Sequence, residues 1–89
     1  MSKVVAAVKA PAWPRNTPAF RESRSPRYST TVLTWQTRMR KRGWSITCDG
    51  RYGPKSADVA EKFQREKHLA VDRLLGPHTF TAAWTAKVT

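Results

Sequence analysis

The chain has 89 residues, 39% of them hydrophobic, which is enough for one small core and excludes several packed domains. Its single cysteine, Cys48, excludes an intramolecular disulfide and is expected to be a small buried residue. The formal net charge is +11, and residues 1–44 carry ten Lys or Arg against one acid, Glu22. Residues 45–89 carry seven bases against five acids. This imbalance indicates an anionic partner: nucleic acid, an acidic cell-wall polymer or an acidic protein surface.

Residues 1–28 are expected to form an extended basic arm in front of a domain over residues 29–89. Four prolines and four arginines interrupt any apolar period in the arm, which is typical of a flexible or polyproline-like linker. Free linkers rarely need large aromatic side chains, so the aromatic residues indicate that something holds the arm in place. The residues predicted to dock it are Trp13, Arg15, Phe20, Arg21, Arg24 and Arg27.

A first helix is predicted over residues 30–42. Ser29 begins a run of N-cap candidates, and Val32, Trp35 and Met39 follow at helical spacing. Gly43 is a natural stop for the helix. Residues 44–48 then form a short extended run.

One short pattern occurs twice after this run. Each copy reads Asp, three residues, Gly-Pro, one residue and a hydroxyl residue, from Asp49 to Ser56 and from Asp72 to Thr79. The two copies are offset by 23 residues throughout. Asp and Gly favour a tight turn, so each copy is expected to form a corner that starts a helix.

The two corners predict the rest of the fold. Ser56 and Thr79 are expected to be the N-caps of helices over residues 57–67 and 80–86. Three helices with short connections make a small all-α domain, and Trp35, Phe63 and Phe80 are expected to share its interior.

No catalytic or metal-binding set is predicted. Cys48, His68 and His78 lack the spacing of a zinc site, and Asp49 with Arg51 lacks the repeated oxygen ligands of a calcium loop. The six acidic residues offer no evident acid/base pair for glycan cleavage. We therefore expect neither an enzyme, nor a cofactor, nor a metal.

The motifs resemble those of the peptidoglycan-binding domain family found beside bacterial and bacteriophage cell-wall hydrolases. The similarity covers about residues 29–86, and the Gly-Pro form looks most like C-terminal modules of lysins from phages of actinobacteria. Arg73 stands where that family usually has Gly, and His68 where Gly often precedes Leu. The matching positions are Val32-Leu33-Thr34-Trp35-Gln36, Gly43, Asp49-Gly50-Arg51-Tyr52-Gly53, Ser56, Ala60, Phe63-Gln64, Leu69, Val71-Asp72, Leu75-Gly76-Pro77 and Thr79.

This resemblance implies binding of bacterial peptidoglycan without catalysis. Sugar rings stack on aromatic faces, and polar groups fix hydroxyls and carboxylates, so the candidate ligand residues are Trp44, Arg51, Tyr52 and Arg40. The alternative is that Trp44 and Tyr52 close the edge of the core.

Three functions are compatible with the sequence. The first is a cell-wall-binding module, and the second is a phage virion component, such as a capsid or tail accessory protein, whose basic arm docks on the particle. The third, nucleic-acid binding, is suggested by charge alone. The apolar run at residues 4–8 is too short for a signal peptide, and no run of ~20 apolar residues could span a bilayer. The protein is therefore expected in the host cytoplasm until lysis, or on a virion surface.

Overall fold

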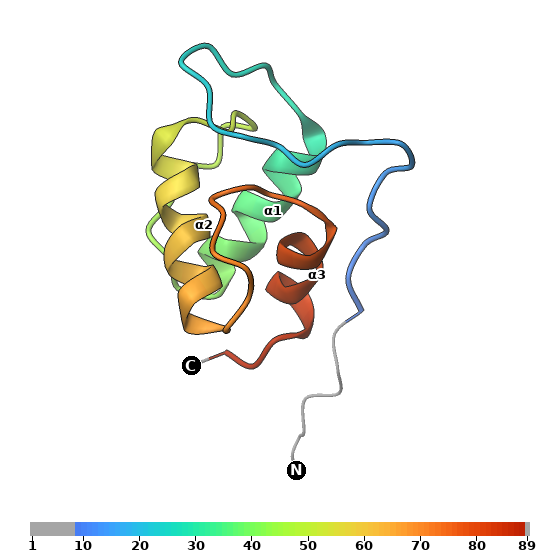
Figure 1. Cartoon of the computed structure of the whole chain (residues 1–89), viewed down its shortest axis with the longest axis vertical. Helices are drawn as coiled ribbons and strands as arrows, with labels where there is room; N and C mark the ends of the chain where they lie inside the picture. The colour runs from blue at the N-terminus through green and yellow to red at the C-terminus, as the bar shows by residue number, and fades with distance from the viewer. Residues whose placement is uncertain (1–8, 89) are drawn as a thin grey trace.

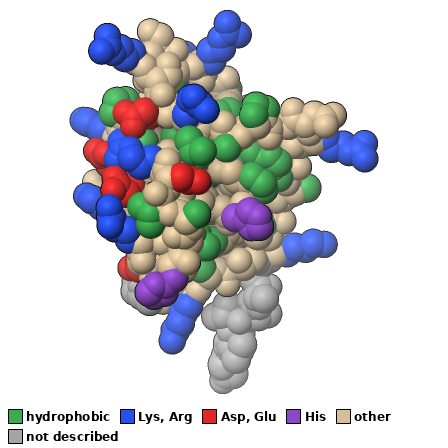
Figure 2. Space-filling model, in the orientation of Figure 1, with side chains coloured by type: hydrophobic (Ala, Val, Ile, Leu, Met, Phe, Trp, Pro, Cys, Tyr) green, Lys and Arg blue, Asp and Glu red, His purple; other side chains and the backbone are tan. Residues whose placement is uncertain are grey.

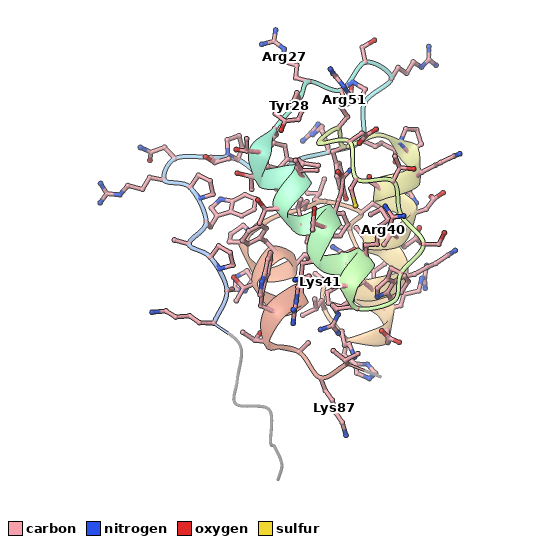
Figure 3. All side chains as sticks on the ribbon, turned by 180° about the vertical axis from the view of Figure 1, so that it is seen from behind. Arg27, Tyr28, Arg40, Lys41, Arg51 and Lys87 are labelled. Carbon is pink, nitrogen blue, oxygen red and sulfur yellow. The ribbon has the colours of Figure 1, made fainter. Side chains whose placement is uncertain are left out.

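Three α-helices make up the fold over residues 9–88, which are the residues that this computed structural model describes (Figure 1). They are α1 (Thr30–Lys41), α2 (Pro54–Glu66) and α3 (Pro77–Thr85). Seen from opposite sides in Figures 1 and 3, α1 covers one side of the core, and α2 and α3 cover the other. The predicted all-α, three-helix class is confirmed. The apolar run at residues 4–8 lies outside the described residues.

α1 begins where the sequence predicts. Ser29 has an extended backbone, and its hydroxyl accepts a hydrogen bond from the Val32 N–H at 3.3 Å. The apolar face, which includes Val32 and Trp35, is fully buried. Gly43 follows the helix with a φ of +100°, a conformation that glycine adopts without strain.

α2 and α3 begin three residues earlier than predicted. In each copy of the repeat, the glycine of the Gly-Pro pair is the N-cap and the proline is the first helical residue. Proline suits this position because its fixed φ is helical and its missing N–H removes no intrahelical bond. The prediction that Ser56 and Thr79 are N-caps is therefore wrong, since both lie inside the first turn.

The Ser56 hydroxyl instead binds a buried glutamine of α1. The Gln36 amide nitrogen donates to Ser56 Oγ at 2.9 Å, to the Arg51 carbonyl at 3.0 Å and to Asp49 Oδ1 at 3.2 Å. Its Oε1 accepts from the Gly50 N–H at 2.7 Å. Gln36 is fully buried, so these bonds satisfy its amide and fix the first corner to α1.

The second corner has the same hydrogen-bonded frame, in which a buried glutamine binds the corner, here Gln64 of α2. The Gln64 amide nitrogen donates to Asp72 Oδ1 at 2.8 Å, and to the Leu74 carbonyl and Thr79 Oγ1 at 3.1 Å. Its Oε1 accepts from the backbone N–H groups of Asp72 and Arg73 at 3.2 and 3.1 Å. The sequence repeat is therefore also a repeat in space, in which a helix holds the next corner through one glutamine.

The three helices share one aromatic interior, as predicted. Trp35 and Phe63 are fully buried and Phe80 is 2% exposed. The other core side chains are Val32, Met39, Tyr52, Ala57, Val59, Ala60, Leu75, Ala82 and Ala83.

No helix among residues 9–88 combines the length and apolar character needed to cross a membrane.

The described part of the arm is extended and lies on the domain. It runs beside α3 and then across the ends of the helices to the start of α1 (Figure 1). Phe20 and Leu75 exchange two backbone hydrogen bonds of 2.9 Å, which joins the arm to the second corner. The Trp13 ring packs edge-on against Phe80 at 5.4 Å between centroids.

Candidate functional site

An open pocket of about 580 Å³ lies between α1, α2 and the loop that joins them. Arg40 comes from the end of α1 and Lys55 from the start of α2, and the loop at residues 44–48 forms the wall between them. The volume falls in the range of roughly 300–1,000 Å³ that is usual for small-ligand sites. The lining residues are Arg40, Trp44, Ser45, Ile46, Thr47, Cys48 and Lys55.

Trp44 is the aromatic residue of this pocket. The backbone N–H of Trp44 donates to the Met39 carbonyl at 3.1 Å, which ties the loop to the end of α1. Its ring packs edge-on against Phe63 at 6.2 Å, so one part of the indole closes the core. The side chain is only half-buried, which leaves indole surface for a ligand.

The bases at the end of α1 serve two purposes. Arg38 and Arg42 turn toward α3, where their guanidinium groups donate to the Ala83 carbonyl at 2.9 and 3.1 Å. Burial, together with the nearby charge of Arg38, lowers the pKa of Arg42. Arg40 and Lys41 are exposed on α1 (Figure 3) and form no ion pair with any residue of the described chain.

The pocket is cationic because Arg40 and Lys55 line it and no acidic side chain of residues 9–88 does. The sequence contains no Asp or Glu from residue 23 to residue 48. The next acid, Asp49, turns its carboxylate onto the Gln36 amide and the Arg51 N–H at 3.2 and 3.0 Å. The charges of Arg40 and Lys55 therefore face solvent without a carboxylate in the lining.

On the face seen in Figure 2, acidic and basic side chains are mixed along the α2 side. Arg73 forms ion pairs with Glu22, Asp58 and Glu61 at 2.7, 2.8 and 2.7 Å. Hydrogen bonds to Glu22, then Asp58 and Glu61, raise the pKa of Arg73. Hydrogen bonds from Arg65 and then Arg73 lower the pKa of Glu61. These ion pairs gather carboxylates around Arg73, away from the pocket.

The structure brings together only two of the four predicted ligand residues. Arg40 and Trp44 line the pocket, whereas Tyr52 is 2% exposed and its hydroxyl donates to the Arg73 carbonyl at 2.9 Å. Burial raises the pKa of Tyr52, as expected for a core phenol. Arg51 turns to the arm, where Nη1 donates to the Pro26 carbonyl at 2.7 Å. Tyr52 thus closes the core, and Arg51 holds the arm.

The predicted docking residues of the arm also separate into two groups. Trp13 and Phe20 are half-buried against the domain of their own chain, with ring centroids 6.0 Å apart. They therefore fasten the arm within the molecule rather than present it to a partner. The remaining four are exposed: Arg15, Arg21, Arg24 and Arg27.

Sequence reasoning missed Lys55, Ser45 and Thr47 as pocket residues. Lys55 directly follows the first Gly-Pro pair, but no pattern showed that the 44–48 loop returns to this helix start. Within residues 9–88, no three His, Cys, Asp or Glu side chains are grouped as metal ligands. The chain matches no family model, no curated protein and no solved structure.

Proposed function

We propose that this protein is a non-catalytic module that binds bacterial peptidoglycan through the pocket beside Trp44. The observation that carries the proposal is the composition of this pocket: a half-buried indole, two hydroxyl residues and two cations without an acid in the lining. Aromatic faces bind sugar rings, and cations bind carboxylates, so the lining suits a glycan that bears peptides.

The duplicated frame gives this proposal independent support. Asp49, Gly50, Ser56 and Gln36 are positions at which the sequence resembles the peptidoglycan-binding family, and they bond to one another in the first corner. The motif therefore describes one physical unit rather than scattered coincidences. The same bonding pattern around Gln64 strengthens this argument.

Binding without cleavage is part of the proposal. Hydrolysis of a glycosidic bond generally needs two carboxyl groups flanking the bond, one of them as general acid. The lining of the pocket offers hydroxyl, thiol, indole and cationic groups instead. Such a set can hold a ligand but lacks the usual acid for its cleavage.

The test is co-sedimentation of the full-length protein with purified peptidoglycan at low ionic strength. The wild type should sediment, and Trp44→Ala should weaken binding roughly tenfold or more if the indole is a central contact. Trp84→Ala is the matched control, because Trp84 is a half-buried indole outside this pocket that packs on Phe80 at 4.8 Å. Absence of wild-type sedimentation, or equal losses in both variants, would contradict the proposal.

A second candidate, a virion component held on the particle by its arm, is favoured by the exposed arginines. Contacts of Trp13 and Phe20 hold the arm on the domain, while its four arginine side chains face outward. Replacing Arg15, Arg21, Arg24 and Arg27 by Gln in the full chain should reduce its incorporation into particles. Normal occupancy by this variant would reject the second candidate.

A further inference from the structure

We infer that the pocket beside Trp44 recognises a free carboxylate of a peptidoglycan stem peptide, held by Arg40 and Lys55. This inference rests on the proposed function and adds the chemical group that the site selects. It predicts that walls whose stem-peptide carboxylates are amidated bind more weakly than walls whose carboxylates are free.

The two cations are suited to one anionic group. Arg40 and Lys55 come from different helices but line the same pocket, and neither makes an ion pair or side-chain hydrogen bond within residues 9–88. The planar guanidinium group of Arg40 can donate two parallel hydrogen bonds to a carboxylate. Lys55 lies in the first turn of α2, where the helix dipole adds positive potential.

The distribution of the other bases favours a compact anion over a long polyanion. In Figure 3, Arg27 lies at one end of the molecule and Lys87 at the other, with Arg40 and Lys41 between them. A nucleic-acid strand needs a continuous positive track along its phosphates. The labelled bases are spread along the length of the molecule in Figure 3, whereas Arg40 and Lys55 line one pocket with an indole wall.

Cys48 provides a local reporter of occupancy. It is the only cysteine of the chain, it is half-buried, and it lines this pocket. A ligand in the pocket should therefore slow its alkylation by a neutral reagent such as N-ethylmaleimide. Binding at the arm, or at the ion pairs around Arg73, should leave the rate of Cys48 alkylation unchanged.

The experiment compares two soluble muropeptides on the full-length protein at constant ionic strength. One probe has free stem-peptide carboxylates, and the other has the same carboxylates converted to amides. The free acid should protect Cys48 at a concentration roughly tenfold lower than the amide, because hydrogen bonds to charged groups are the stronger ones. In the Arg40→Gln and Lys55→Gln variants this difference should shrink.

Lys62→Gln is the charge-matched control. Lys62 is an exposed base of α2 outside the pocket, so its loss should leave the preference for the free acid intact. Equal protection by the two muropeptides would overturn the carboxylate inference but leave the proposed function standing. If neither muropeptide protects Cys48 and the wild type does not sediment with peptidoglycan, the proposed function itself fails. Protection by a DNA oligonucleotide, but by neither muropeptide, would indicate a phosphate polymer and also reject the inference.

Discussion

The two corners of this protein are built on the same frame but differ where they face the arm. In both, a buried glutamine binds the Asp carboxylate, a backbone carbonyl and the hydroxyl residue. The residue after Asp has a positive φ in both, +74° at Gly50 and +62° at Arg73. The frame thus demands a left-handed residue, although only the first corner uses glycine there.

The contacts between each corner and the arm explain why only the first corner has glycine at this position. A Cβ on Gly50 would lie 2.5 Å from the Tyr28 ring of the arm, so any side chain there would have to displace this ring. At the second corner the Arg73 side chain has room and reaches Glu22 of the arm. The arm therefore crowds a side chain at one corner and binds one at the other.

The outward positions diverge further. Arg51 and Lys55 of the first corner correspond to Leu74 and His78 of the second, at the same offset of 23 residues. A pocket borders each corner, of about 450 Å³ at the first and about 520 Å³ at the second, and these pairs line the two pockets at equivalent positions. Residues that point into the frame are therefore alike in both copies, whereas residues that point outward differ in charge. The pocket of the proposed function borders the first copy, where these outward positions are cationic.

The largest effect is expected from removing the shared frame. Gln36→Ala or Gln64→Ala leaves buried backbone and hydroxyl groups without partners, so each should lower the free energy of unfolding by about 3 kcal/mol or more. Urea unfolding followed by circular dichroism measures both losses. If the corners are equivalent in energy as in geometry, the two losses should be similar. A loss below about 1 kcal/mol in either variant would show that its glutamine does not hold the corner.

The second prediction concerns the two corner residues of positive φ, Gly50 and Arg73. Gly50→Ala should lower the free energy of unfolding by about 2 kcal/mol, because it adds backbone strain and a contact with the Tyr28 ring. Arg73→Gly should change it much less, because relief of backbone strain opposes the loss of solvent-screened ion pairs. The same urea titration compares the two variants. Similar losses would mean that the arm does not decide which residue each corner accepts.

Much of this frame was open to prediction from the sequence. The repeat at Asp49 and Asp72 predicted two corners that start helices, and the spacing of Trp35, Phe63 and Phe80 predicted one core. The turn-forming residues of the repeat and the helical spacing of the apolar residues were enough for these two predictions. The N-caps were wrong because the hydroxyl residue had two possible partners, the helix end or a glutamine distant in sequence.

The site was less predictable, because it depends on contacts between distant segments. Trp44 and Arg40 were predicted as ligand residues, since an aromatic residue and a base near a corner suit a glycan, and both line the pocket. The role of Lys55 required knowing how the 44–48 loop folds back. The burial of Tyr52 and the contact of Arg51 with the arm depend on tertiary packing, which residue type alone does not reveal.

The third prediction concerns Tyr52, which ties the first copy to the second through the Arg73 carbonyl. Tyr52→Phe removes this bond and should cost about 1 kcal/mol at neutral pH. Because burial raises the pKa of Tyr52, its stabilising contribution is complete below the ordinary value of 10.0 and declines as pH rises above it. The wild type should therefore lose stability more steeply than Tyr52→Phe as the pH rises above about 10, where an unfolded tyrosine ionises. Parallel pH profiles from urea titrations would contradict this.

The smallest effect is expected at Glu61, which belongs to the cluster of ion pairs around Arg73 at the second corner. Its pKa is lowered by hydrogen bonds from Arg65 and Arg73, so its contribution is present above the ordinary value of 4.5 and is lost as pH falls below it. The melting temperature of the wild type should exceed that of Glu61→Gln slightly at pH 7, and the two should converge in acid. High salt should also reduce the difference, because the cluster is open to solvent. A difference that persists in acid would mean that Glu61 stabilises the protein by packing rather than by charge. Its ion pair would then contribute little to holding Arg73 at the turn position where the first copy has glycine.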